Sequence, residues 1–150
     1  MNYAIVFRLL SYILLCESAL LMLPAATSAI YGEWSVLGAF LITAALCVVF
    51  GLLLRLAKPT SKVFYMREGF ATTALSWIVI SIMGAVPFVL TGCIPDPIDA
   101  LFETVSGFTT TGASILPAVE GLPRGILLWR SFTHWIGGMG VLVLTLALLP

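Results

Sequence analysis

The sequence predicts an all-α transmembrane protein, and three observations support this fold class. The mean hydropathy is +1.13. Hydrophobic residues make up 61% of the chain and charged residues only 9%, whereas a soluble domain carries roughly 25% charged residues. Runs without a charged residue recur along the chain, and such runs can cross a hydrocarbon core of about 30 Å as helices. Basic and acidic residues balance at seven each, so we expect no nucleic-acid partner.

The first two predicted helices form a leading hairpin over residues 1–57. The second helix, 34–54, has no charged residue. The first helix, 6–23, contains Arg8 and Glu17, and Glu17, in the middle of the run, is expected to face protein rather than lipid. A basic start, an apolar run and small residues also fit a cleaved secretory signal. Glu17 argues against that signal, because it interrupts the apolar run.

The loop 58–68 sets the predicted orientation. Basic side chains cluster in and beside this loop: Arg55, Lys58, Lys62 and Arg67. Glu68 is the only opposing charge, so the positive-inside rule places the loop in the cytoplasm. The amino terminus is then cytoplasmic, and residues 24–33 and 91–124 lie on the outer side.

The outer segment lies between two further predicted crossings, an outer helix over 69–93 and an inner helix over 123–150. It begins with residues that favour the start of a helix. Asp96 can cap a helix, Pro97 suits its first position, and Asp99 lies near the positive end of its dipole. A helix over 97–107 would be about 15 Å long, which is half a bilayer. This length is typical of a re-entrant pore helix.

Residues 109–114 follow directly and read Thr-Thr-Thr-Gly-Ala-Ser. Three β-branched residues and a glycine predict an extended strand. Such a strand is tolerated in a membrane only where it is buried in protein or lines a watery cavity. Four strands around an axis would surround a monovalent cation with backbone carbonyls. The alternative is an ordinary outer loop, because a lone Thr-x-Gly motif is weak.

Residues 108–114 read FTTTGAS and residues 129–140 read WRSFTHWIGGMG. These motifs resemble the Trk-type potassium uptake subunits (TrkH/TrkG) of the Trk/Ktr/HKT superfamily, and the resemblance covers the whole chain. It implies one polypeptide with four helix, pore-helix, filter and helix units around a pseudo-fourfold pore, of which 69–150 would be the first. The chain stops after one unit, so we expect an amino-terminal portion of a longer protein; assembly with separate units is the other interpretation.

The resemblance also implies which residues bind the ion. Gly112 matches the critical filter glycine, and Thr110 and Thr111 match the residues whose carbonyls line the K⁺ sites. Thr109 and Ala113 flank them. The implied function is potassium transport through a backbone-carbonyl filter, with no cofactor and no enzymatic step. A non-conducting membrane assembly or anchor protein is the alternative.

The resemblance further implies the partners and the location. Besides potassium and the lipid bilayer, the partners are the remaining pore units, a second copy in a homodimer, and a cytoplasmic nucleotide-binding regulatory subunit like TrkA. The location is the inner (plasma) membrane of a bacterial cell. The sequence does not support an intramembrane enzyme. The serines of the chain have only His134 as a possible base, and no acid lies in the spans beside that histidine.

Several other side chains have two interpretations each. Glu103 could concentrate cations at the outer mouth, as acidic rings do, or belong to a solvated helix face. Arg130 and His134 share a helix face and are expected to contact a neighbouring unit or the outer loop. The three glycines of 137–140 could form a hinge or allow close helix packing.

Overall fold

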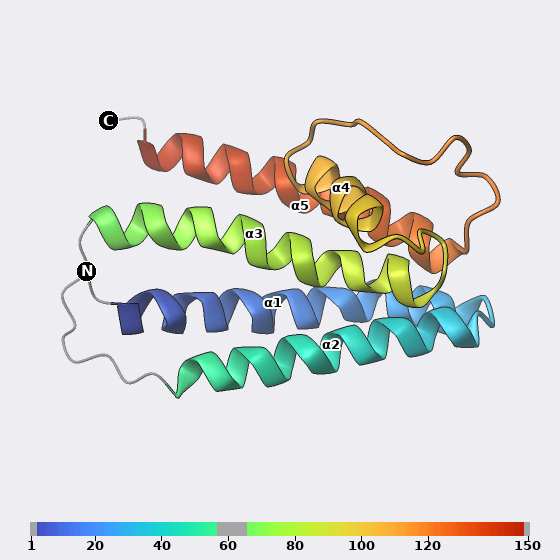
Figure 1. Cartoon of the computed structure of the whole chain (residues 1–150), viewed down its shortest axis with the longest axis horizontal. Helices are drawn as coiled ribbons and strands as arrows, with labels where there is room; N and C mark the ends of the chain where they lie inside the picture. Colours follow the sequence, from blue (N-terminus) through green and yellow to red (C-terminus); the bar gives the residue numbers. More distant parts are fainter. Residues whose placement is uncertain (1–2, 57–65, 149–150) are drawn as a thin grey trace.

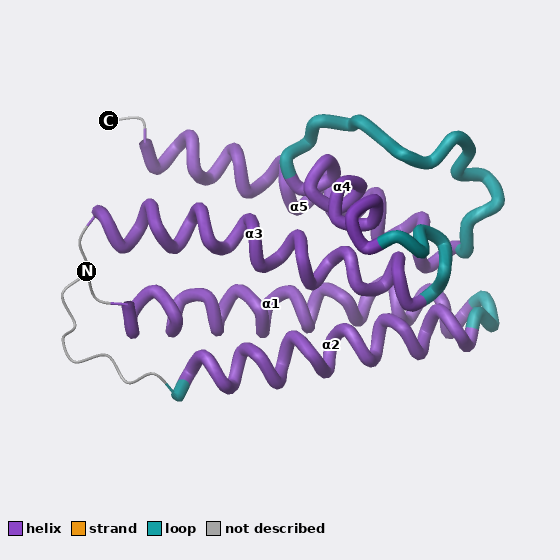
Figure 2. Tube along the Cα trace, viewed as in Figure 1, coloured by secondary structure: helices purple, strands orange, loops and turns teal. Residues whose placement is uncertain are grey.

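The computed structural model of the protein describes residues 3–56 and 66–148, which form five helices. Their bounds are α1 (Tyr3–Ile30), α2 (Trp34–Arg55), α3 (Met66–Leu90), α4 (Pro97–Phe108) and α5 (Arg124–Leu148). The long helices α1, α2, α3 and α5 run side by side, while α4 is steeply inclined to them (Figure 1). Figure 2 shows the long irregular connection between α4 and α5 at the end of the bundle that also holds the α1–α2 turn.

Within the described residues, three helices are long and apolar enough to cross a membrane: α1, α2 and α3, with 28, 22 and 25 residues. Helix α5 also has 25 residues, and a helix of that length measures about 38 Å, more than a hydrocarbon core. The all-α transmembrane class is thereby confirmed. The last residues of the expected inner helix, 149–150, lie outside the described residues, as do residue 57 and most of the basic loop, 58–65. Residues 66–68 of that loop belong to α3.

The first helix is longer than the expected 6–23, because α1 continues through Pro24 to Ile30. The placement of residues 24–33 on the outer side stays a prediction. The proline is buried in the helix, and its missing N–H leaves the carbonyl of Leu20, four residues earlier, without its usual donor. Ser28 Oγ donates to the carbonyl of Pro24 itself at 2.9 Å. The chain turns only over residues 31–33, where Gly32 adopts a φ of 73°, a conformation that costs glycine little.

Glu17 faces protein, as the sequence predicts. Its side chain lies in the middle of α1 and only 4% of the residue is exposed. Neither carboxylate oxygen has a hydrogen-bond partner among the described residues. The buried position of an ionisable group in α1 follows the rule that such groups avoid lipid.

Trp129 of α5 is the centre of the core and fixes α4 against the long helices. Its ring is fully buried, and its Nε1 donates to the carbonyl of Gly84 in α3 at 2.9 Å. Phe40 of α2 and Phe108 of α4 pack edge-on against the indole, each with ring centroids 6.4 Å apart. Such aromatic pairs add about 0.5–1.5 kcal/mol to area burial. One side chain therefore joins α2, α3, α4 and α5.

Candidate functional site

The start of α4 is built from local sequence signals, and it confirms the predicted helix start. Asp96 is the N-cap, and its Oδ1 accepts from the backbone N–H of Ile98 at 2.7 Å and of Asp99 at 3.3 Å. Pro97 occupies the first helical position, where its missing N–H is not needed. The helix therefore begins at the residue that its capping chemistry selects.

The end of α4 has the hydrogen bonds of a Schellman cap. The N–H of Thr110 donates to Gly107 O at 2.9 Å, and the N–H of Thr111 donates to Ser106 O at 3.0 Å. Such a cap needs a left-handed residue directly after the C-cap, usually glycine or asparagine. Here Thr110 takes that position with a φ of 56°. A left-handed conformation is a genuine outlier for a β-branched residue and costs roughly 1–2 kcal/mol.

The backbone of the predicted filter segment, 109–114, therefore differs from the expected extended strand. It begins with a turn at Thr109 and Thr110 and continues without regular structure. The reason is that the last carbonyls of α4 need donors, and the first residues of the segment supply them. Gly112 is also left-handed, with a φ of 76°.

The three threonine hydroxyls form hydrogen bonds with polar groups around this turn. Thr109 Oγ1 donates to Val105 O at 2.7 Å and lies 2.8 Å from Thr111 Oγ1. Thr110 Oγ1 donates to Thr109 O at 2.7 Å. Hydroxyls that bond to nearby backbone in this way stabilise non-helical conformations. The hydroxyls thus stabilise a turn whose backbone is strained at Thr110.

Glu103 holds the far end of the segment. Its carboxylate accepts from Ser114 Oγ at 3.0 Å, from Ile115 N–H at 3.0 Å and from Arg130 Nε at 2.6 Å. We call Glu103, Arg130 and Ser114 the clamp. Ser106 Oγ of α4 adds a bond to Ala113 O at 2.5 Å. Both ends of the segment are therefore bonded to α4.

Glu103 does not lie on a solvated helix face, and its role at the outer mouth stays a prediction. The residue is only 2% exposed, and the guanidinium of Arg130 lies against its carboxylate. A buried carboxylate that is paired with a cation neither forms a solvated helix face nor presents free charge to an entering ion. Its geometry suits it to hold the backbone after Gly112.

The predicted ion-binding residues lie together at the surface of this chain. Thr109, Thr110, Thr111, Gly112 and Ala113 are consecutive and all exposed. No described atom lies within 4 Å of the position where a Cβ on Gly112 would stand. The arrangement leaves one side of the segment open, while α4 and the clamp support its two ends.

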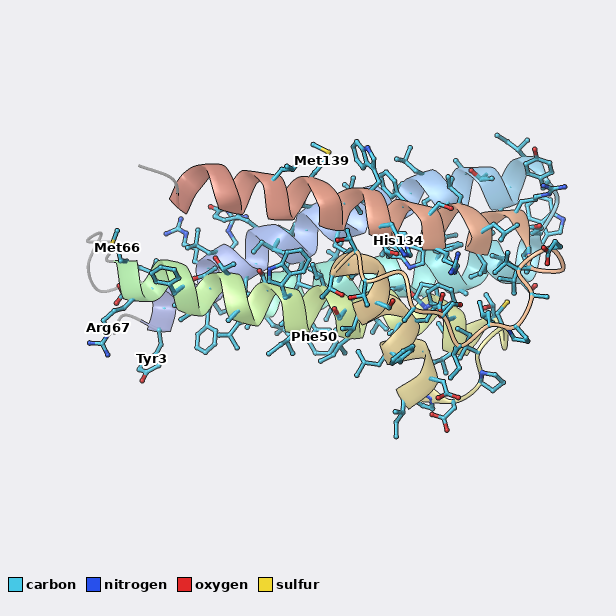
Figure 3. All side chains as sticks on the ribbon, turned by 90° about the horizontal axis from the view of Figure 1, so that it is seen from above. Tyr3, Phe50, Met66, Arg67, His134 and Met139 are labelled. Carbon is cyan, nitrogen blue, oxygen red and sulfur yellow. The ribbon has the colours of Figure 1, made fainter. Side chains whose placement is uncertain are left out.

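Helix α5 lies against the end of α4 through Gly137. A Cβ on Gly137 would collide with the backbone of Phe108, its Cα only 2.9 Å away. His134, labelled in Figure 3, has its Nδ1 2.9 Å from the carbonyl of Arg130. The contact between Gly137 and Phe108 supports the interpretation that Gly137 allows close helix packing. Gly138 is different, because among the described atoms a Cβ there would meet only Thr110 Cγ2, at 3.8 Å.

Sequence reasoning noted Glu103 and Arg130 separately and missed that they pair. The signal was present: an anion and a cation in an otherwise apolar unit must find partners when they are buried. Ser106 and Ser114 are serines that the enzyme interpretation would use only as nucleophiles. Ser106 donates to Ala113 O of the segment, and Ser114 of the segment donates to Glu103. Both bonds depend on how the chain folds back along α4, which no local pattern specifies.

Comparison with known proteins gives a consistent result. The family model TrkH, described as "Cation transport protein", matches residues 37–150. Trk system potassium uptake protein TrkH of Halomonas elongata is 36% identical over the whole chain, and TrkH of Escherichia coli is 34% identical over the whole chain. An uncharacterized cation transporter of Methanocaldococcus jannaschii, MJ1485, is 40% identical over 83% of the chain.

The chain spans 31% of the length of each of these two TrkH proteins and 26% of MJ1485. The named relatives are transport proteins rather than enzymes, and the apolar helices identify a multi-pass membrane protein. Because the family model covers most of the sequence, the chain belongs to the TrkH family of cation transport proteins.

Proposed function

We propose that this chain is one pore unit of a potassium transporter, and that the carbonyls of Thr110, Thr111 and Gly112 form its share of the K⁺ sites. Thr109 and Ala113 flank these carbonyls. The relatives named as potassium uptake proteins support the choice of ion. A carbonyl filter replaces the hydration shell of the ion and involves no covalent chemistry.

The observation that carries the proposal is the left-handed Thr110 at the end of α4. An ordinary outer loop would take glycine or asparagine at this position, because both fit the Schellman cap with less strain. Strained backbone persists where the surrounding structure holds it, and it clusters at functional sites. The alternative of a plain surface loop or a non-conducting anchor gives no reason for this strain.

The field of α4 supports a cation at the same place. The helix has 12 residues, and its carboxyl end, which carries about half a negative charge, lies at Thr109. Its length of about 18 Å lets it end inside a bilayer rather than cross it. A cation beside this end is stabilised without any charged side chain.

One unit would supply only part of a closed site. We propose that the remaining units of the same polypeptide complete the ring, that the transporter pairs with a second copy, and that a nucleotide-binding subunit like TrkA docks on its cytoplasmic face. The basic residues near 58–68 support a cytoplasmic amino terminus. The relatives from bacteria support a location in the bacterial inner membrane.

The test compares two glycines of the full-length protein that share a backbone conformation. Gly112 and Gly92 have φ values of 76° and 72°, and no described atom lies within 4 Å of a Cβ added at either. Gly112→Ser and Gly92→Ser thus introduce equal backbone strain, but only Gly112 belongs to the predicted filter. Both variants are expressed in a bacterial strain that lacks potassium uptake.

We expect Gly112→Ser to lower the preference for K⁺ over Na⁺ by roughly tenfold, about 1.4 kcal/mol of discrimination, while Gly92→Ser retains it. Uptake per protein molecule is measured with K⁺, Rb⁺ and Na⁺. If the two variants behave alike, the assignment of the filter to Thr110, Thr111 and Gly112 is wrong.

A further inference from the structure

The turn between α1 and α2 supplies the cap of α5. Glu33 in this turn accepts through Oε1 from the N–H of Arg124 at 2.7 Å and through Oε2 from the N–H of Gly125 at 3.1 Å. These are the first two donors of α5. A carboxylate at a helix amino terminus satisfies free N–H groups and interacts favourably with the helix dipole.

Helix α5 has no capping group of its own. The residues before it are Leu122 and Pro123, whose side chains offer no acceptor, and its first turn contains no acidic residue. Helix starts without a cap lose about 1 kcal/mol. The cap therefore comes from the hairpin, 91 residues earlier in the sequence.

The same end of α5 is packed tightly against the hairpin. A Cβ on Gly125 would collide with Ser28 Oγ of α1 and lie 3.2 Å from the ring of Phe40 in α2. The guanidinium of Arg124 lies 5.8 Å from the ring centroid of Tyr31, within the range of a cation–π contact. Close packing at Gly125 and two charge-assisted bonds to Glu33 fix the axial position of α5.

The position of α5 in turn sets the position of the clamp. Arg130 lies less than two turns after Gly125 on α5, and its Nε donates to Glu103 at 2.6 Å. Glu103 also holds Ser114 and Ile115 at the end of the segment 109–114. A continuous series of bonded groups thus runs from the hairpin to the backbone that follows Gly112.

We propose that Glu33 is a positioning residue for ion selection: the leading hairpin, through Glu33, sets the position of α5 and hence the shape of the filter segment. This inference rests on the proposed function. It gives the hairpin a part in ion selection, although the hairpin contributes no residue to the segment itself.

The test uses the full-length protein, purified and reconstituted in vesicles at equal protein amounts. Glu33→Ala removes both acceptors, and Glu33→Gln keeps one acceptor without the charge. Glu120→Ala is the matched control, because Glu120 is exposed in the outer loop and its carboxylate accepts from the N–H of the adjacent Val119. The KM for K⁺ and the preference for K⁺ over Na⁺ are measured for each.

We expect Glu33→Ala to raise the KM for K⁺ or to lower the K⁺ preference by roughly three- to tenfold, which corresponds to the loss of a charged cap. Glu33→Gln should show about a twofold change in the same quantity, and Glu120→Ala should match the parent. A merely structural role would reduce the amount of folded protein and leave both quantities unchanged per molecule.

Parental KM and ion preference in Glu33→Ala would overturn the proposal. If that variant does not accumulate, Glu33→Gln decides the question, and parental values in it overturn the proposal. Gly112→Ser in the same vesicles separates the two claims. If Gly112→Ser alters the ion preference while the Glu33 variants do not, the role of Glu33 is wrong and the filter assignment stands.

Discussion

The two ends of α4 differ in how well their residue types suit the backbone conformation. At its start, Asp96 caps the helix and Pro97 takes the first position, which are the residue types that stabilise a helix start. At its end, Thr110 takes a left-handed conformation that glycine would adopt with less strain. The start is built for stability, whereas the end retains strain.

The two ends of α4 also differ in which residues stabilise them. The start of α4 needs only its own residues, and its cap is exposed. The end depends on distant partners: Trp129 packs on Phe108, and Arg130 holds Glu103. A strained segment that is held by packing and bonds from another helix is pre-organised, as ion-binding and catalytic sites require.

The largest expected effect on the free energy of unfolding comes from removing the clamp residue Glu103. Glu103→Ala leaves Arg130 without its partner and frees Ser114 and Ile115, so we expect a loss of about 3 kcal/mol in the free energy of unfolding. This is the low end for a buried pair, because 23% of the Arg130 side chain is exposed. Unfolding of the detergent-solubilised full-length protein measures the loss.

The matched variant is Glu103→Gln, which keeps an acceptor for Ile115 and Ser114 and should lose less stability than Glu103→Ala. Both variants should also lower the preference for K⁺ over Na⁺. If Glu103→Ala unfolds at the same point as the parent, the clamp does not support the end of α4.

A smaller effect is expected at the other end of the helix. Asp96→Ala removes the N-cap and should reduce the free energy of unfolding by about 1 kcal/mol. The preference for K⁺ over Na⁺ should stay at the parental value, because Asp96 is bonded to the first turn of α4 only through local groups. Asp96→Asn, which retains a capping oxygen, is the control. A change in ion preference in Asp96→Ala would remove the distinction between the two ends.

The same contrast explains what the sequence could predict. The start of α4 was predictable because a cap, a proline and a first-turn acid act within four residues. The predicted first helix, 6–23, is too short, because α1 continues through the buried Pro24 to Ile30. Hydropathy predicted the long helices, because length and apolar content alone decide whether a helix can cross a bilayer.

The end of α4 could not be predicted from residue preferences. Three successive threonines favour an extended strand, and a Schellman cap is normally signalled by glycine, so the sequence indicates the wrong backbone at Thr110. The pairs Glu103–Arg130 and Glu33–Arg124 join residues 27 and 91 positions apart, and their pairing depends on tertiary structure. The assignment of Thr110, Thr111 and Gly112 to ion binding came from resemblance and stays a prediction.

Thr110→Gly tests most directly the central claim, that backbone strain at Thr110 serves the filter. Its expected change in stability is the smallest of the three. Glycine relieves the left-handed strain but loses more chain entropy on folding, so we expect the free energy of unfolding to rise by about 0.5 kcal/mol. If the strain serves the filter, the stabilised variant should have a several-fold weaker preference for K⁺ over Na⁺ per molecule. A Thr110→Gly protein that is more stable and keeps the parental preference would contradict the account.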